Sequence, residues 1–335
     1  MGGGAVTAAP LVDSFGRRHR DLRISLTDRC SLRCTYCMPA EGMPWLASGT
    51  LLTLAETTRI AAVAVQHGIE EIRLTGGEPL LRPDVVQVVE ALAGLPGSPE
   101  VSMTTNGLRL GGLAQGLKDA GLARLNVSLD TLSRERYQQL TRRDRLGQVL
   151  AGLVAADAAG FEGTKINTVL LRGVNEDEAP ALLRFALERG YELRFIEQMP
   201  LDAGHTWTME GMVRADEVQA LLSEHFDLVP VPGRGSAPAE RWSVDGTQSA
   251  VGIIASVTRP FCGACDRIRL TADGQLRSCL FAQEETDLRT LLRSGGTDEQ
   301  ISAALGLTVA QKAAGHAVGQ AGFEQPGRGM SAIGG

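Results

Sequence analysis

The segment that decides the fold runs Leu22-Arg-Ile-Ser-Leu-Thr-Asp-Arg-Cys30-Ser-Leu-Arg-Cys34-Thr-Tyr-Cys37. Its first half, Leu22–Asp28, alternates apolar and polar residues, which predicts a half-buried strand. The cysteines follow on the loop after that strand, with three and then two residues between them. Three thiolates on one loop can bind three irons of a four-iron cubane and leave the fourth iron open to a small molecule. A structural zinc site completed by a further ligand is the alternative interpretation.

This strand is the first of six strand patterns that alternate with helical patterns. The predicted strands are Leu22–Asp28, Glu71–Gly76, Glu100–Thr105, Arg124–Asp130, Lys165–Leu171 and Glu192–Met199. The predicted helices are Leu54–His67, Pro83–Gly94, Leu113–Gly121, Leu146–Gly160 and Asp177–Gly190. Repeated β–α units predict a parallel sheet, and the fold class is therefore α/β, a partial (βα)6 TIM-type barrel.

Unusual residues follow these strands. Gly76-Gly77-Glu78-Pro79 comes after the second strand, Thr105-Asn106-Gly107 after the third, and Ser128–Asp130 ends the fourth. Active sites of such folds lie at the carboxyl ends of the strands. We therefore expect the site at that end of the barrel, beside the cysteine loop.

The pattern changes after about residue 212, toward a smaller α+β extension. A helix near Ala215–His225 leads to a Pro/Gly-rich link at Pro230–Pro238. Further predicted strands are Arg241–Val244, Ala250–Thr258, Arg267–Leu270 and Leu276–Leu280, and further predicted helices are Thr286–Arg293 and Asp298–Ala314, before a glycine-rich tail, Gly315–Gly335. The predicted domains are residues 1–225, the barrel with the first cluster, and residues 226–335, the extension with a second cluster and the tail.

A second cysteine triplet occurs in the extension. Cys262, Cys265 and Cys279 span a hairpin predicted around Asp273-Gly274, so that the third thiolate returns beside the first two. Zinc ribbons also use a hairpin, but they supply four ligands, and no fourth cysteine or histidine lies nearby in the sequence. A second cubane with an open iron is therefore favoured over zinc. Arg267 and Arg269 alternate on the strand and share one face, which suits an anion or a base with acceptor atoms.

The composition of the chain argues against nucleic acid and membranes as partners. The chain has 335 residues, 43% of them hydrophobic, and a formal net charge of −6, so no general basic field points to nucleic acid. No apolar run approaches the roughly 20 residues of a membrane span, and Met1–Pro10 does not resemble a signal sequence. We therefore expect a cytoplasmic protein with no membrane partner. Thiols stay reduced in that compartment, which favours metal binding over disulfides.

The first triplet, with Tyr36 just before its last cysteine, resembles the signature of the radical S-adenosylmethionine superfamily. The resemblance implies that Cys30, Cys34 and Cys37 bind a [4Fe–4S] cluster whose open iron binds S-adenosylmethionine. It also implies that the cofactor is cleaved to methionine and a 5′-deoxyadenosyl radical. Residues that match the family's cofactor-binding positions are Tyr36, Gly77, Ser128 and Met199.

Both triplets together, with Arg267, Arg269 and the terminal Gly334-Gly335, resemble the GTP 3′,8-cyclases over essentially the whole chain. That resemblance implies a lyase of molybdenum cofactor biosynthesis with two [4Fe–4S] clusters. The 5′-deoxyadenosyl radical would abstract the 3′ hydrogen of GTP, and cyclisation would give (8S)-3′,8-cyclo-7,8-dihydroguanosine 5′-triphosphate. Implied partners are GTP, an electron donor, and cyclic pyranopterin monophosphate synthase, which takes the product. The oligomeric state stays open, with a homodimer as one option.

The resemblance also assigns roles to single residues. It implies catalytic roles for Arg23, Arg267 and Arg269, and binding of the guanine edge by the second cluster, at Cys262, Cys265 and Cys279. Positions that match its GTP contacts are Arg23, Arg73, Thr104, Lys165, Arg267, Ile268 and Arg269, with Arg194 as an additional candidate. Glu71 stands where a basic residue is expected, which leaves open how the triphosphate is bound. Ala332 stands where the family often has Arg, which leaves open an arginine-based role for the tail.

Two other functions fit part of the pattern. The first is another radical S-adenosylmethionine enzyme with an auxiliary cluster, acting on a peptide or protein. The second is a zinc-stabilised binding module without catalysis. GTP dependence separates the first from the cyclase, and the brown colour of iron–sulfur protein separates the second.

Overall fold

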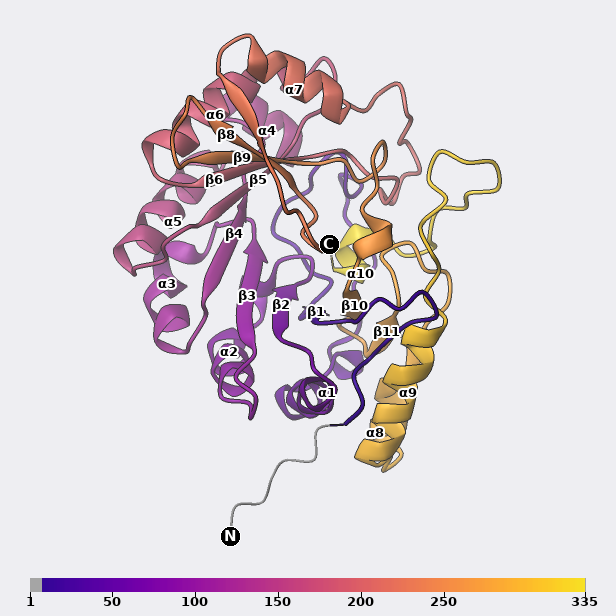
Figure 1. Cartoon of the computed structure of the whole chain (residues 1–335). Coiled ribbons are helices and arrows are strands. Elements are labelled where there is room, and N and C mark those ends of the chain that lie inside the picture. The colour runs from indigo at the N-terminus through magenta and orange to yellow at the C-terminus, as the bar shows by residue number, and fades with distance from the viewer. Residues whose placement is uncertain (1–7, 335) are drawn as a thin grey trace.

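The structure is a computed structural model that describes residues 8–334. Six parallel strands pair in chain order to form a curved sheet (Figure 1). They are β1 (Asp21–Ser25), β2 (Glu71–Thr75), β3 (Glu100–Thr105), β4 (Arg124–Ser128), β5 (Lys165–Val169) and β6 (Glu192–Ile196). The parallel sheet confirms the predicted fold class, a partial barrel with a C-terminal extension.

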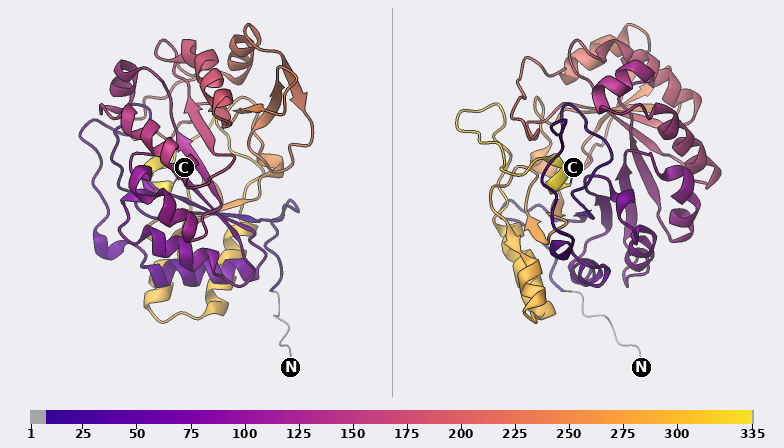
Figure 2. Two further views of the ribbon diagram at one scale, coloured as in Figure 1. Left: turned by 90° about the vertical axis from the view of Figure 1, so that its left-hand side faces the viewer. Right: turned by 180° about the vertical axis from the view of Figure 1, so that it is seen from behind.

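Helices cover the convex face of this sheet (Figure 2). They are α1 (Leu54–Gln66), α2 (Val85–Ala93), α3 (Leu110–Asp119), α4 (Arg134–Thr141), α5 (Leu146–Ala158) and α6 (Ala179–Glu188), with short 3-10 turns η1 (Ser48–Thr50), η2 (Pro79–Leu81) and η3 (Glu176–Glu178). Thr53 caps α1 by accepting a hydrogen bond from the amide of Glu56, whose carboxylate accepts one from the amide of Thr53. Apolar residues one helical turn apart, such as Ile60 and Ala64, then pack on the sheet.

The C-terminal extension lengthens the sheet at both edges. Next to β6 lie β9 (Ala250–Ile254), β8 (Glu240–Val244) and β7 (Leu228–Val231), and next to β1 lie β10 (Arg267–Leu270), β11 (Gln275–Arg277) and β12 (Thr286–Asp287). The helices of this part are α7 (Ala215–Ser223), η4 (Cys262–Ala264), α8 (Leu288–Arg293), α9 (Asp298–Ala310) and α10 (Met330–Ile333). One continuous sheet thus crosses the predicted boundary at residue 225, and the division into two domains stays a prediction.

Several predicted elements end earlier in the structure, and four elements were missed: β7, β12, α4 and α10. β1 stops at Ser25 rather than Asp28, because the next residues turn into the cysteine loop, where the Asp28 carboxylate accepts the Leu46 amide at 2.6 Å. β7 overlaps the first residues of the segment predicted as a link, and β12 takes the first two residues of a predicted helix. α4 has a mostly polar sequence without a clear helical period, and α10 lies in the glycine-rich tail.

The sheet buries alternate residues on its helix-covered face and presents the others to the barrel interior. Leu22 and Ile24 of β1 are fully buried in the main hydrophobic core, whereas Arg23 between them lines the interior cavity. The parallel register places Arg23 opposite Arg73 of β2 on one side and opposite Arg269 of β10 on the other. Three guanidinium groups therefore lie in one row across three strands.

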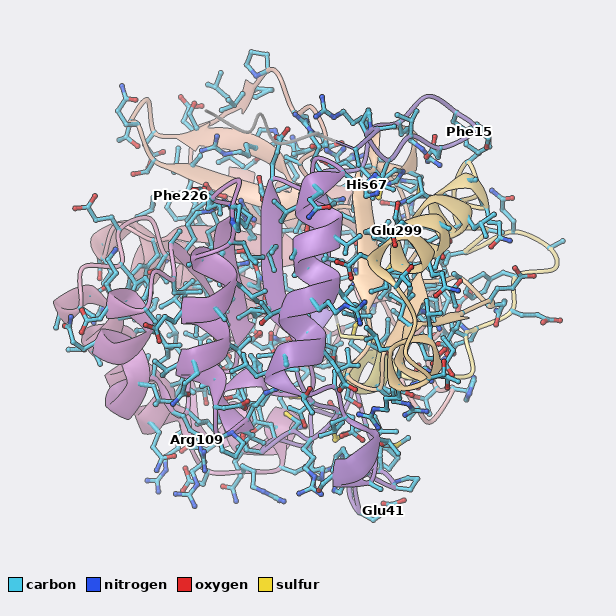
Figure 3. All side chains as sticks on the ribbon, turned by 90° about the horizontal axis from the view of Figure 1, so that it is seen from below. Phe15, Glu41, His67, Arg109, Phe226 and Glu299 are labelled. Atoms are coloured by element: carbon cyan, nitrogen blue, oxygen red, sulfur yellow. The ribbon has the colours of Figure 1, made fainter. Side chains whose placement is uncertain are left out.

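The helical end of the extension packs beside α1. In Figure 3, His67 at the end of α1 lies near Glu299 of α9. A ring nitrogen of His67 is 2.7 Å from the Ser302 hydroxyl, and Arg59 pairs with Asp298 at 2.7 Å. Among residues 8–334, no helix has the length and apolar character that crossing a membrane requires.

Candidate active site

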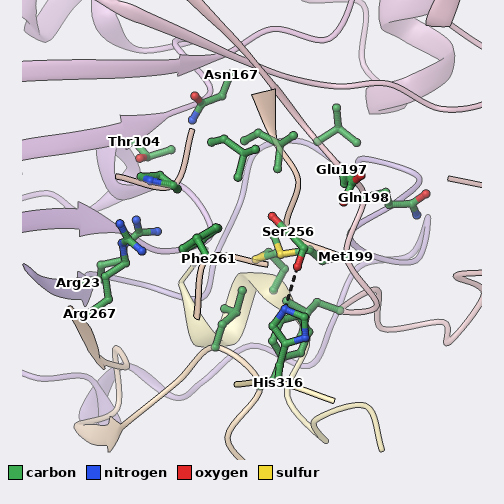
Figure 4. Close-up of a pocket in the computed structure, with 18 of the residues that line it drawn as sticks. Arg23, Thr104, Asn167, Glu197, Gln198, Met199, Ser256, Phe261, Arg267 and His316 are labelled. Carbon is green, nitrogen blue, oxygen red and sulfur yellow. Dashed lines mark hydrogen bonds between the residues drawn. The ribbon is translucent and has the colours of Figure 1, made fainter. Parts of the chain in front are cut away.

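A cavity of about 280 Å³ opens inside the barrel (Figure 4). It is lined by most of the residues predicted to bind GTP or the cofactor: Arg23, Tyr36, Arg73, Thr104, Ser128, Arg194, Met199, Arg267 and Arg269. All three cysteines of the second triplet line it as well. The predicted residues outside its lining are Cys30, Cys34, Cys37, Gly77, Lys165 and Ile268. Ile268 packs in the hydrophobic core, so only its main chain is able to meet a ligand.

The arginine row gives the cavity a strong positive charge with little compensation. Asp21 is the shared carboxylate, 3.3 Å from Nε of Arg267 and 3.8 Å from Nε of Arg23. Burial alone would raise the pKa of Asp21, but the surrounding guanidinium groups bring it below its usual value. Burial also lowers the pKa values of Arg23 and Arg73, and lowers that of Arg269 to about 10. Several buried cations around one carboxylate form a site for a multivalent anion.

Lys165 and Arg194 extend this charge along β5 and β6. Burial and the neighbouring Arg194 lower the pKa of Lys165 to about 8. Arg194 donates to Glu192 at 2.6 Å. Glu71, which stands where a basic residue was expected, pairs with Arg124 at 3.2 Å. At this position the chain therefore has a carboxylate paired with Arg124, and not a basic side chain.

The loop with the first triplet is fixed by its own backbone and by α4. The amides of Cys37 and Met38 donate to the carbonyl of Cys34 at 2.9 and 3.0 Å. The Arg142 guanidinium donates to the carbonyls of Arg33 and Met38 at 2.8 and 3.1 Å. The three thiols are half-buried and free of disulfides. Burial raises their pKa values, that of Cys37 to about 12, so the thiolates need a cationic metal to form.

The segment Gly76-Gly77-Glu78 runs directly against this loop. The amides of Gly77 and Glu78 donate to the carbonyls of Thr27 and Arg29, both at 2.7 Å. A Cβ on Gly77 would lie 2.4 Å from the carbonyl oxygens of Asp28 and Arg29, so only glycine permits this approach. The predicted cofactor segment therefore lies beside the first triplet, although Gly77 does not line the cavity.

Tyr36 reaches from the same loop toward β4. Its hydroxyl donates to the Asp130 carboxylate at 2.7 Å, and burial raises the pKa of Asp130 to about 6. Asp130, Ser128 and Met199 line the cavity with Tyr36. The sequence prediction missed Asp130 as a partner of Tyr36, because the pairing joins two strand ends that are far apart along the chain.

The second triplet lines the same cavity as Ser128 at the end of β4. His316 lines the same cavity, but one ring nitrogen is 2.8 Å from the Ser256 carbonyl and the other accepts the Val318 amide at 3.3 Å (Figure 4). Both ring nitrogens of His316 therefore have hydrogen-bond partners. Within the described chain, no three Cys, His, Asp or Glu side chains converge on a single metal ion. In a cubane each cysteine binds a different iron, so such convergence is not required.

Lysine and arginine surround this second triplet. The Lys312 ammonium is 3.5 Å from the sulfur of Cys265, and a guanidinium nitrogen of Arg267 is 3.8 Å from it. Burial would raise the pKa of Cys265, but Lys312 and Arg267 lower it below the usual value. Arg17 donates to the carbonyl of Cys262 at 2.6 Å. The sequence prediction missed Lys312 and Arg17, since each meets the triplet only through the tertiary fold.

The C-terminal tail ends in α10, which lies near β10 (Figure 1). Burial raises the pKa of Cys37, and a hydrogen bond from the main chain of Ser331 offsets part of that rise. Met330 lines the cavity, and Arg269 donates to the carbonyl of Gly334. Ala332 donates its amide to Gly329 at 3.1 Å. Of the predicted glycine pair, Gly335 lies outside the described residues.

Family comparisons agree with this geometry. Residues 24–186 match the Radical SAM superfamily, and residues 191–318 match Molybdenum Cofactor Synthesis C. The solved structure of Streptococcus suis SuiB bound to the precursor peptide SuiA is similar in fold, with a TM-score of 0.59 over 91% of this chain and 71% of SuiB. Its sequence identity is 14%, so this likeness concerns the fold alone.

Close relatives span the whole chain. The GTP 3′,8-cyclase of Streptomyces coelicolor is 58% identical over 97% of this chain and 96% of its own length. The GTP 3′,8-cyclase of Mycolicibacterium smegmatis is 54% identical, with 97% and 92% covered, and GTP 3′,8-cyclase 2 of Mycobacterium tuberculosis is 53% identical, with 98% and 93% covered. Radical SAM membership implies S-adenosylmethionine and a [4Fe–4S] cluster, and the six cysteines fit two such clusters. The chain belongs to the GTP 3′,8-cyclase family of radical S-adenosylmethionine enzymes.

Proposed function

We propose that this enzyme converts GTP and S-adenosylmethionine to (8S)-3′,8-cyclo-7,8-dihydroguanosine 5′-triphosphate, the first step of molybdenum cofactor biosynthesis. The observation that carries the proposal is one cavity that joins Tyr36 of the first cysteine loop, the second triplet, and the guanidinium row of Arg23, Arg73 and Arg269. That combination suits a nucleoside triphosphate placed between two clusters.

The cofactor end of the cavity is formed by the first triplet and its neighbours. Cys30, Cys34 and Cys37 would hold the first cluster, which with bound S-adenosylmethionine supplies the radical that removes the 3′ hydrogen of GTP. Ser128 and Met199 line the adjoining wall, where the adenosine part would bind. Tyr36 is oriented by its hydrogen bond to Asp130, which fixes the ring at the cavity wall.

The substrate end is formed by the cations. Arg23, Arg73 and Arg269 present donors to the triphosphate, with Thr104 on the next strand and Lys165 and Arg194 further along the sheet. Cys262, Cys265 and Cys279 would hold the second cluster, which would bind the guanine edge. Two anchors at opposite ends of one substrate restrict it to a reactive geometry, and such positioning accounts for a large part of many barriers.

The proposal also includes two protein partners, the enzyme that takes the product and the electron donor. The product carries a new bond within the nucleotide and still bears its triphosphate, so a second enzyme, cyclic pyranopterin monophosphate synthase, would complete the rearrangement. An external low-potential donor would supply the electron for cofactor cleavage. The proposed division into residues 1–225 and 226–335 assigns one cluster to each part.

Anaerobic reconstitution tests the function. We expect about eight irons per chain and conversion of GTP when S-adenosylmethionine and a strong reductant are present. ATP, which carries the same triphosphate on another base, is the matched control and should not be cyclised. Recovery of unchanged GTP from fully loaded protein would contradict the proposal.

A further inference from the structure

Lys312 is a buried cation beside the second triplet. It follows α9, and its side chain is 3% exposed. The ammonium is 3.5 Å from the Cys265 sulfur and 2.5 Å from the carbonyl oxygen of Arg267, to which it donates. It lines the active-site cavity and also a second cavity on the other side of the triplet. Lys312 therefore lies between the cysteine and the strand that carries the substrate-facing arginines.

This ammonium has no carboxylate partner within residues 8–334. The neighbouring cations differ in this respect, because Arg17 pairs with Asp13 at 2.6 Å and Arg267 with Asp21 at 3.3 Å. A buried charge without an opposite charge is costly. The nearest anion available to Lys312 is the thiolate of Cys265, which has to form when the cysteine binds iron.

The surroundings of the first triplet have the opposite character. Among the described side chains, those that donate to its sulfurs are uncharged: the Asn106 amide group is 3.8 Å from the Cys30 sulfur. The charged groups nearby include the carboxylates of Glu78 and Asp130, which are 1% and 6% exposed. Arg33 also acts on Cys30, but the carboxylates of Glu78, Asp130 and Asp202 outnumber it around the first triplet. Around Cys265 the charged neighbours are the cations Lys312 and Arg267.

We propose that Lys312 tunes the second cluster, raising its reduction potential above that of the first cluster through its hydrogen bond to Cys265. The inference rests on the proposed function, since it requires both clusters. Adding an electron makes a cluster more negative, and a positive donor at a ligand sulfur stabilises that reduced state. Carboxylates near the other cluster act in the opposite direction. The chain thus separates a strongly reducing cluster for cofactor cleavage from a more easily reduced one that faces the substrate.

Redox titration of the full-length, anaerobically reconstituted protein tests this role. Electron paramagnetic resonance would follow both clusters in the wild type and in Lys312→Met, which removes charge and donor at similar length. Lys312→Gln removes the charge but keeps a donor. Lys118→Met is the matched control, because Lys118 is half-buried, donates to the Gly160 carbonyl and lines neither cavity. A background with Cys30, Cys34 and Cys37 changed to Ala identifies the signal of the second cluster.

We expect the midpoint of the second cluster to shift to more negative potential in Lys312→Met, and by less in Lys312→Gln. The first midpoint and both midpoints of Lys118→Met should stay at the wild-type values. An unshifted second midpoint in iron-replete Lys312→Met would overturn the inference. Loss of about half the iron in both Lys312 variants would also overturn it, since Lys312 would then be a structural clamp. Failure of the wild type to load two clusters would instead count against the proposed function.

Discussion

Lys165 lies on β5 beside Arg194, where burial and the adjacent guanidinium lower its pKa to about 8. A triphosphate binds the protonated ammonium better than the neutral amine, so the attraction is complete below this pKa and is lost as the pH rises through it. We expect the Kd for GTP to increase about tenfold between about pH 7 and pH 9. Calorimetric titration with GTP across that range measures the effect.

Lys165→Met provides the control, because it removes the titrating group. This variant should bind GTP more weakly at neutral pH and show a much flatter pH profile over the same range. Equal pH slopes for the wild type and the variant would show that another group, on the protein or on GTP, causes the dependence.

Gly334 occupies a position that only glycine fits. Its φ is +84°, and an added Cβ would lie 2.6 Å from the Thr75 hydroxyl oxygen and 2.8 Å from Cβ of Ser25. We expect Gly334→Ala to displace the end of the tail from Arg269 and to lower turnover about tenfold or more, equivalent to roughly 1.4 kcal/mol of barrier. Steady-state assays measure this loss.

The matched control is Gly327→Ala, where an added Cβ meets no atom within 4 Å. Both variants should keep the wild-type circular dichroism spectrum, since the tail follows the last strand of the sheet. Full turnover in Gly334→Ala would show that the contact with Arg269 is dispensable.

The two cysteine loops are the elements that divide the chemistry. We expect Ala at Cys30, Cys34 or Cys37 to abolish cleavage of S-adenosylmethionine. Ala at Cys262, Cys265 or Cys279 should preserve some cleavage but abolish cyclisation, because in the proposed arrangement the second cluster would face the substrate rather than the cofactor. Chromatography of 5′-deoxyadenosine and of the nucleotide product, from one reaction, separates the two losses. Equal loss of cleavage in both sets would contradict this division.

Individual elements differ in how well the sequence predicts them. β3 and β10 have the predicted bounds. In both strands apolar residues that face the core alternate with polar residues that face the barrel interior, and this pattern specifies a strand locally. α4, Arg134–Thr141, was missed because it is polar almost throughout and depends on the Ser133 cap and its contacts with the cysteine loop. α10 was missed because only the tertiary fold orders a short helix in a glycine-rich tail.

At the scale of the whole molecule, the sequence predicts which reactive residues are present better than it predicts which of them lie side by side in the fold. Arg23 and Arg269 were both named as site residues, but their opposition depends on β10 pairing with β1 across more than two hundred residues. The local sequence of either strand does not predict this pairing register. Lys312 is hidden for the same reason, since a single lysine after a helix carries no signal until the fold places it beside Cys265.

The proposed function requires that the cofactor radical reach the 3′ carbon of GTP inside one cavity. The most direct measurement uses GTP deuterated at that carbon with the reconstituted protein, S-adenosylmethionine and reductant, followed by mass spectrometry of 5′-deoxyadenosine. We expect one deuterium in each 5′-deoxyadenosine that forms together with cyclic product. Unlabelled 5′-deoxyadenosine alongside unchanged GTP would contradict it.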